Sequence, residues 1–136
     1  MPALSTYDYA IVRVVPSIER EEFVNAGVIL FCRTRRFLQA QIDLDEDRLL
    51  ALAPGADLES VREHLDCIPT VCEGGPEAGP IGRLSQAERF HWLVAPRSTI
   101  IQPSPVHSGL TSDPARTLQH LLEAMVKSSR TPQPSR

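Results

Sequence analysis

The alternation of hydrophobic and polar residues in the first third of the chain predicts three β-strands. Residues 7–15 are rich in aromatic and β-branched side chains, and Pro16 ends this run. Residues 23–32 are the most apolar segment, with apolar side chains at both alternating sets of positions, which indicates a central strand covered on both faces. A charged turn leads from there into a third strand over residues 37–43. We therefore expect the second and third strands to form a hairpin.

Strict alternation also predicts which side chains of these strands share a face. In the first strand, Ala10, Val12 and Val14 should be buried together. In the second strand, one face should consist of Val24, Ala26, Val28, Leu30 and Cys32. Gly27 weakens this strand unless a bulge lies there or another segment approaches the backbone closely.

Helical spacing and capping residues predict helices in the middle of the chain. Acidic residues precede a group of leucines over residues 45–53, and apolar residues recur at helical spacing over residues 58–68. Ser85 and Glu88 form a capping box, in which each side chain can bond the backbone amide of the other residue. This motif predicts a third helix over residues 85–94.

The last third of the chain predicts one more strand and one more helix. Residues 98–102 should form a short strand, and residues 103–112 an irregular loop in which Gly109 permits a tight turn. Asp113 and Pro114 mark a helix start, with the carboxylate at the N-cap and proline at the first helical position. The apolar stripe of this helix consists of Leu118, Leu121, Leu122 and Met125.

The order of these elements predicts the fold class. Strands first, helices next and one late strand indicate an α+β fold, with a small, mostly antiparallel sheet of about four strands packed with four helices. A chain of 136 residues fits one domain, which we place at residues 1–127. Residues 128–136 have nothing to bury, and we expect them to form a disordered tail.

Composition and charge narrow the possible function classes. The chain has 14 Lys and Arg against 17 Asp and Glu, a net charge of −3, which disfavours a protein whose main task is to coat nucleic acid. The longest apolar run, residues 28–32, is far shorter than the roughly 20 residues of a membrane-spanning helix. The first residues lack the pattern of a signal peptide, so we expect a cytoplasmic protein.

The cysteines predict free thiols. Cys32, Cys67 and Cys72 are odd in number, which favours reduced thiols over a disulfide framework. No second Cys or His pair completes a zinc site at the usual spacings, and no Walker loop, G-x-G-x-x-G or H-E-x-x-H motif occurs. We therefore expect neither a metal nor a cofactor, and the pattern identifies no catalytic residue.

Three motifs, in order along the chain, carry a family resemblance. They are Tyr-Asp-Tyr-Ala-Ile-Val-Arg at residues 7–13, Glu-Phe-Val-Asn-Ala-Gly-Val-Ile-Leu at residues 22–30, and Pro-Ser-Pro-Val-His-Ser-Gly-Leu-Thr at residues 103–111. Together they resemble the bacterial DUF3037 family, whose function is unknown. The resemblance implies a compact bacterial cytosolic protein. Because such proteins are often encoded beside a HipA-like kinase, it also implies a protein partner.

The segment over residues 106–113 is the first candidate binding site. It leads into a helix N-terminus, where free amides and the helix dipole attract anions, and His107, Ser108 and Thr111 add an imidazole and hydroxyls. The alternative is a capped loop, because the Asp113 carboxylate can satisfy the same amides and opposes an anion. His107, Ser108 and Asp113 are also the residue types of a hydrolase triad, but adjacent residues seldom meet in that geometry.

Arg13 is the second candidate. It lies in an apolar strand, so its guanidinium should be paired or lie at an edge. If the first two strands pair, Arg13, Asn25 and His107 could form a polar cluster that binds an anionic group. The alternative is an ion pair with Asp8, Glu22 or another acidic residue that holds the sheet together.

Arg33, Arg35 and Arg36 form the densest basic patch of the sequence. Three guanidiniums at a hairpin tip could bind the phosphates of a nucleic acid. No aromatic stacking residues interleave with them, and the overall charge is negative, so the alternative is a solvated turn.

These observations lead to three hypotheses for function. The first is an accessory or regulatory protein that acts through protein–protein contact. The second is a small anion- or nucleotide-binding protein, which could be an enzyme, that uses Arg13, Asn25, His107, Ser108 and Thr111. The third is nucleic-acid binding through the turn at residues 33–36.

Overall fold

The computed structural model describes residues 3–97 and 99–127. The expected tail at residues 128–136 and the first residue of the strand expected at 98–102 lie outside the described residues. Among the described residues, no helix has both the length and the apolar character that a membrane span needs.

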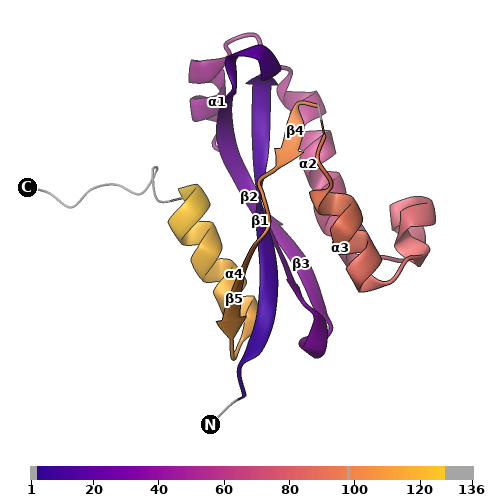
Figure 1. Ribbon diagram of the computed structural model, residues 1–136. Helices are drawn as coiled ribbons and strands as arrows, with labels where there is room; N and C mark the ends of the chain where they lie inside the picture. Colours follow the sequence, from indigo (N-terminus) through magenta and orange to yellow (C-terminus); the bar gives the residue numbers. More distant parts are fainter. Residues whose placement is uncertain (1–2, 98, 128–136) are drawn as a thin grey trace, which may run out of the picture.

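The strands form one antiparallel sheet built around two long strands (Figure 1). They are β1 (Ser5–Ser17), β2 (Glu22–Cys32), β3 (Phe37–Ile42), β4 (Ile101–Pro103) and β5 (His107–Thr111). The order β3-β2-β1-β4 confirms the hairpin of β2 and β3. On the other side of β1, β5 pairs with residues 5–9 and β4 with residues 12–14.

The sheet has five strands where we expected about four, because residues 107–111 form β5. We predicted an irregular loop there, since this segment lacks an apolar alternation. Its backbone pairs with β1 while most of its side chains stay exposed. The segment therefore needs no alternation of apolar and polar residues, and its sequence does not show that it is a strand. Gly109 lies within the strand and not in a tight turn. A Cβ atom at Gly109 would lie 2.6 Å from the Tyr7 hydroxyl oxygen, so the glycine makes room for this ring.

Helices cover both faces of the sheet (Figure 1). One face carries α1 (Glu46–Leu52), α2 (Leu58–Glu73) and α3 (Gln86–Val94), and the other carries α4 (Pro114–Leu122) with a π-helical turn at Glu123–Lys127. Short 3-10 segments lie at Ile18–Arg20, Arg33–Arg35 and Pro76–Arg83. These elements confirm the α+β class. The helix α2 continues through Pro69 for another four residues, so this proline does not end it.

Hydrogen bonds at the N-caps confirm the predicted helix starts. The N-cap side chains of the four α-helices each accept a hydrogen bond from a backbone amide three residues later; the caps are Asp45, Asp57, Ser85 and Asp113. At Ser85 the reciprocal bond is also present, because the Glu88 carboxylate accepts from the Ser85 amide at 3.1 Å. Local sequence therefore fixes where these helices begin.

A β-bulge at Ala26 determines which side chains of β2 face which core. Val12 pairs with Gly27, but Arg13 pairs with Asn25, so Ala26 is an extra residue in β2. Strict alternation along β2 is therefore wrong: Val24 and Ala26 pack in the α1–α3 core with Ile29 and Phe31. The opposite core, under α4, receives Val28, Leu30 and Cys32.

Both explanations offered for Gly27 apply. The bulge lies at the adjacent residue, Ala26, and β3 passes close to the Gly27 backbone. A Cβ atom at Gly27 would lie 2.7 Å from the Gln41 carbonyl oxygen and 2.7 Å from the Ile42 Cδ1. A larger residue would therefore have to displace β3 from β2.

Candidate binding groove

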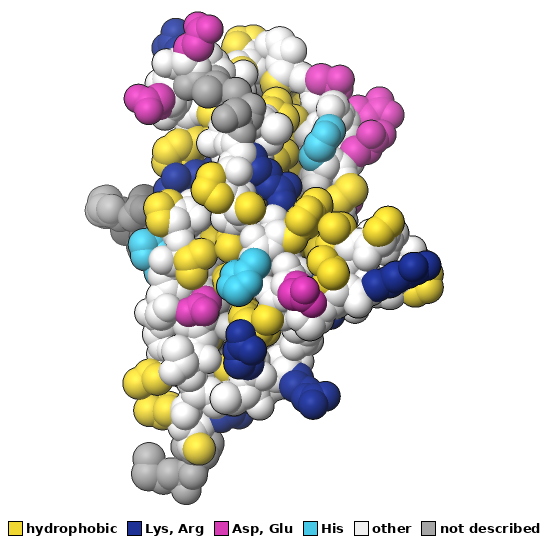
Figure 2. Space-filling view, turned by 45° about the vertical axis from the view of Figure 1, so that its right-hand side comes forward, with side chains coloured by type: hydrophobic (Ala, Val, Ile, Leu, Met, Phe, Trp, Pro, Cys, Tyr) yellow, Lys and Arg dark blue, Asp and Glu magenta, His cyan; other side chains and the backbone are white. Residues whose placement is uncertain are grey.

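An apolar groove lies where α2, α3 and β4 meet, and its volume is about 300 Å³. Val12 and Ile29 of the sheet form its floor, and its walls come from Ile68 of α2, Leu93 of α3 and Ile101 of β4. Figure 2 shows hydrophobic side chains gathered over this side of the molecule, with acidic side chains grouped beyond its upper border. Concave apolar sites with a few polar groups are the usual form of a ligand-binding site.

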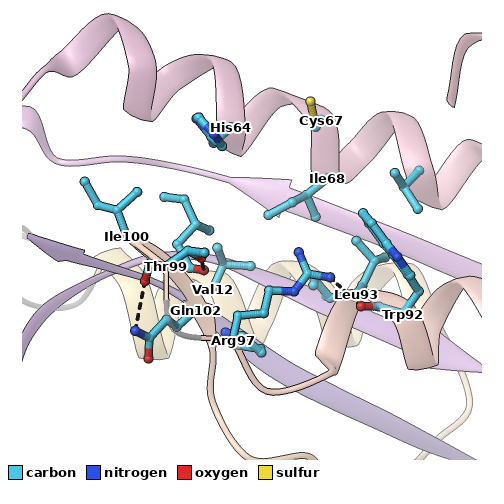
Figure 3. Close-up of a pocket in the computed structure, with 14 residues that line it drawn as sticks. Val12, His64, Cys67, Ile68, Trp92, Leu93, Arg97, Thr99, Ile100 and Gln102 are labelled. Carbon is cyan, nitrogen blue, oxygen red and sulfur yellow. Dashed lines mark hydrogen bonds between the residues drawn. The ribbon is translucent and has the colours of Figure 1, made fainter. Parts of the chain in front are cut away.

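Two residues of α2, His64 and Cys67, lie along the upper border of this groove, and the Cys67 sulfur is on the far side of the helix from Arg97 and Trp92 (Figure 3). The His64 Nδ1 atom lies 2.7 Å from the Ser60 carbonyl oxygen. Because a carbonyl only accepts, Nδ1 carries the hydrogen, and Nε2 is left as the second polar atom of the ring. No hydrogen bond joins the Cys67 thiol to His64, so the pair is not arranged as a nucleophile and its base.

Trp92 and Arg97 form the other end of the groove (Figure 3). The Trp92 side chain is 41% exposed, and the Arg97 guanidinium carbon lies 4.5 Å from the centroid of its ring. Arg97 also donates a hydrogen bond to the Trp92 carbonyl oxygen. Burial lowers the pKa of Arg97 from its ordinary value, but a guanidinium remains charged at neutral pH. Within residues 3–97 and 99–127, no carboxylate forms an ion pair with Arg97.

The backbone of β4 does not offer a free strand edge to a ligand. Pro103 has no N–H group, and the Ile101 carbonyl accepts a hydrogen bond from the Thr99 hydroxyl at 2.8 Å. A proline and a capped carbonyl are typical of protected sheet edges. A ligand in this groove would therefore contact side chains and not extend the sheet.

We expect Cys67 to be the one thiol of the native protein that reacts rapidly with Ellman's reagent at pH 8. Cys67 is exposed, whereas Cys32 and Cys72 are buried. Burial raises the pKa of the Cys72 thiol to about 12, so almost no reactive thiolate exists at pH 8. The measurement is the absorbance of released thionitrobenzoate, with all three thiols reacting in denaturant as the control. Rapid release of two equivalents from the folded protein would contradict this expectation.

The structure brings Arg13 and Asn25 together as direct partners across β1 and β2. The Arg13 guanidinium carbon lies 4.2 Å from the Phe23 ring centroid, and the Asn25 side chain donates to the Met125 carbonyl at 3.0 Å. The Arg13 Nε and Asn25 Oδ1 atoms are buried and have no hydrogen-bond partner among the described residues. Arg13 forms no ion pair with a carboxylate of the described residues, and this includes Asp8 and Glu22, which were expected as alternative partners.

The other three predicted ligand-binding residues lie apart from this pair. His107 is opposite Tyr9, four residues along β1 from Arg13, which corresponds to about 13 Å at the rise of a β-strand. The Ser108 hydroxyl donates to Asp8 at 2.6 Å, and the buried Thr111 hydroxyl lies 2.6 Å from that of Thr117. The structure therefore joins two of the five residues and places the rest along β5.

The three arginines of the hairpin tip have separate contacts. The Arg35 side chain donates to the Ser5 hydroxyl at 2.9 Å and to the Ala3 carbonyl. The Arg33 guanidinium carbon lies 5.8 Å from the centroid of the Phe31 ring, and Arg36 adopts a left-handed backbone conformation that ends the 3-10 turn. All three residues are exposed. Arg35 thus fastens the start of the chain to the tip.

Sequence reasoning missed the groove, although its residues carried a weak signal. Trp92 is the single tryptophan, and together with Arg97 it flanks the proline that ends α3. Nothing in the local pattern shows that this helix end meets α2 and β4. Among the described residues, no three His, Cys, Asp or Glu side chains are grouped so that they could hold a metal ion.

Comparison with known proteins supports one assignment. No curated protein and no solved structure shows significant similarity to the chain. Residues 9–126 match the family described as "Protein of unknown function (DUF3037)", and these residues include most of β1, all of β2 and the helices α1 to α4. The chain therefore belongs to the DUF3037 family.

Proposed function

We propose that the protein is a non-catalytic accessory protein that binds a short segment of a partner protein in the α2–α3–β4 groove. The observation that carries this proposal is a 41% exposed tryptophan at the end of an apolar hollow of about 300 Å³. Exposed aromatic side chains beside a pocket are typical anchors of protein–protein contacts. The volume is at the small end of ligand-binding sites, so it fits a few side chains of a segment better than a whole surface.

The test is photo-cross-linking from Cys67, the exposed thiol that lines the groove. The protein is labelled there with a thiol-reactive benzophenone and irradiated with a purified partner, beginning with the HipA-like kinase that the family resemblance suggests. The matched control carries Cys67→Ser and Leu110→Cys, which moves the label to an exposed position on β5. We expect an adduct from position 67 that Trp92→Ala abolishes, and none from position 110. Equal adducts from both positions would contradict a groove-specific contact.

A second candidate function, anion binding, is favoured by one observation at Arg13. Its guanidinium lacks a carboxylate partner in the described part of the chain, and its Nε atom is buried without an acceptor. A phosphate or carboxylate of a small ligand would supply that acceptor. In a thermal-shift series with phosphate and nucleotides, stabilisation of the wild type that Arg13→Gln removes would support this function over the first.

A further inference from the structure

The position of Arg97 indicates what kind of segment the groove accepts. Its side chain crosses the front of the groove beside Ile68 and Leu93 (Figure 3). Of the five N–H hydrogens of a guanidinium, the contacts in the described chain use the one donated to Trp92. The guanidinium carbon lies over the Trp92 ring, and the other N–H groups donate to no acceptor in the described residues, so they can donate to an acceptor of a ligand. Carboxylates bind guanidinium edges through two parallel hydrogen bonds.

The surroundings of Arg97 make a carboxylate a favourable partner. The groove is lined mainly by aliphatic side chains, which replace water around the guanidinium without supplying a counter-charge. A partly buried charge without a partner is destabilising, and a paired one is much less so. The lowered pKa of Arg97, which burial causes, has the same physical origin.

The charges outside the groove limit the ligand to few negative groups. Glu63 and Asp66 are exposed on α2, beside the groove-lining Cys67. Arg97 is the single Lys or Arg side chain among the residues that line the groove. A polyphosphate in the groove would therefore meet one guanidinium, with the Glu63 and Asp66 carboxylates in the adjacent pocket, whereas Arg97 matches a single carboxylate.

We propose that the groove recognises a peptide segment in which one carboxylate lies among bulky apolar side chains, with the carboxylate bound by Arg97. This inference rests on the proposed function and specifies its ligand class. The apolar side chains would lie over Val12 and Ile29, against α2 and α3. Because the β4 edge is capped, recognition comes from side chains and charge, and not from added strand hydrogen bonds. The carboxylate could belong to an Asp or Glu side chain or to the C-terminus of the partner.

A set of synthetic hexapeptides tests this inference with the full-length protein. Five positions of each peptide carry leucine, phenylalanine or serine in mixed order. The sixth position carries Glu in one version of the peptide and Gln in the other. Each is made with a free and with an amidated C-terminus, and decanoate is included as a small apolar carboxylate. Binding is followed by the fluorescence of Trp92, which is the sole tryptophan, and by protection of Cys67 from Ellman's reagent.

We expect Glu peptides or free-C-terminal peptides to bind roughly tenfold more tightly than their uncharged counterparts, the effect of one charge-assisted hydrogen bond. The two C-terminal forms distinguish a side-chain carboxylate from a terminal one. Arg97→Gln should remove the preference and retain the weaker binding of uncharged peptides. Arg97→Lys should keep part of it, and Arg116→Gln on α4 should leave it unchanged.

The outcomes separate this inference from the proposed function. Equal binding of Glu and Gln peptides to the wild type would overturn the proposed contact between Arg97 and a peptide carboxylate. Protection of Cys67 by both peptides would still support a groove that binds apolar segments. If no peptide protects Cys67, both proposals fail. If decanoate binds and every peptide fails, the ligand is a small apolar carboxylate and the peptide proposal is overturned.

Discussion

Arg89→Met is expected to lower the free energy of unfolding by about 3–5 kcal/mol, as removal of a charged donor from buried acceptors does. Arg89 is 8% exposed and lies inside α3. Its side chain donates to the carbonyl oxygens of Val71 at 2.9 Å, Cys72 at 2.5 Å and Leu84 at 3.1 Å. The first two carbonyls belong to the last turn of α2, where helices lack internal donors. Methionine fills similar space but leaves these acceptors unpaired.

Urea unfolding followed by far-ultraviolet circular dichroism measures this effect. The matched control is Arg83→Met, which removes an exposed arginine just before α3 and should change stability by less than about 0.5 kcal/mol. Arg89→Lys should fall between the two, because an ammonium group cannot span all three carbonyls as a guanidinium does. A loss below about 1 kcal/mol for Arg89→Met would show that water replaces the arginine.

Features that depend on neighbouring residues were predictable from the sequence. The capping box of Ser85 and Glu88 and the start of α4 at Asp113 each need contacts within three residues, and both are present. The two long strands and the hairpin likewise follow from apolar runs and a charged turn. In each case the signal and the structure it specifies lie in the same short segment.

Features that depend on distant segments were not predictable. The bulge at Ala26 is a property of how β1 and β2 align, and it reverses the faces of Val24 and Ala26. The strand β5 exists because β1 leaves a backbone edge free beside β4. No local pattern marks Arg89 as a buried side chain, since two of its three acceptors lie 17 and 18 residues earlier in the chain.

The candidate sites show the same division. Arg13 and Asn25 could be paired from the expected alignment of two strands, and they are partners in the sheet. His107 could not be placed, because its distance from Arg13 depends on where β5 joins β1. The groove forms only where α2, α3 and β4 meet, and no local sequence pattern indicates that these three elements are in contact.

Leu118→Ala is expected to lower the free energy of unfolding by about 3–5 kcal/mol, the range for deleting a large aliphatic side chain from a rigid core. Leu118 is fully buried and joins α4 to Ile11, Val28 and Leu30 of the sheet. Leu110→Ala is the matched control, since Leu110 is 64% exposed on β5 and its removal creates no cavity. Urea unfolding by circular dichroism compares the two variants.

The same experiment decides whether the two faces of the sheet unfold together. Leu118 lies on the α4 side, whereas Trp92, the sole tryptophan, reports on the groove across the sheet. Neighbouring residues of β1 such as Ile11 and Val12 belong to opposite cores, so loosening one side disturbs the strand that the other side needs. We therefore expect Trp92 fluorescence and circular dichroism to shift to the same lower urea concentration in Leu118→Ala. A fluorescence transition that keeps its wild-type midpoint would mean that the groove side forms a separate unit, stable without α4.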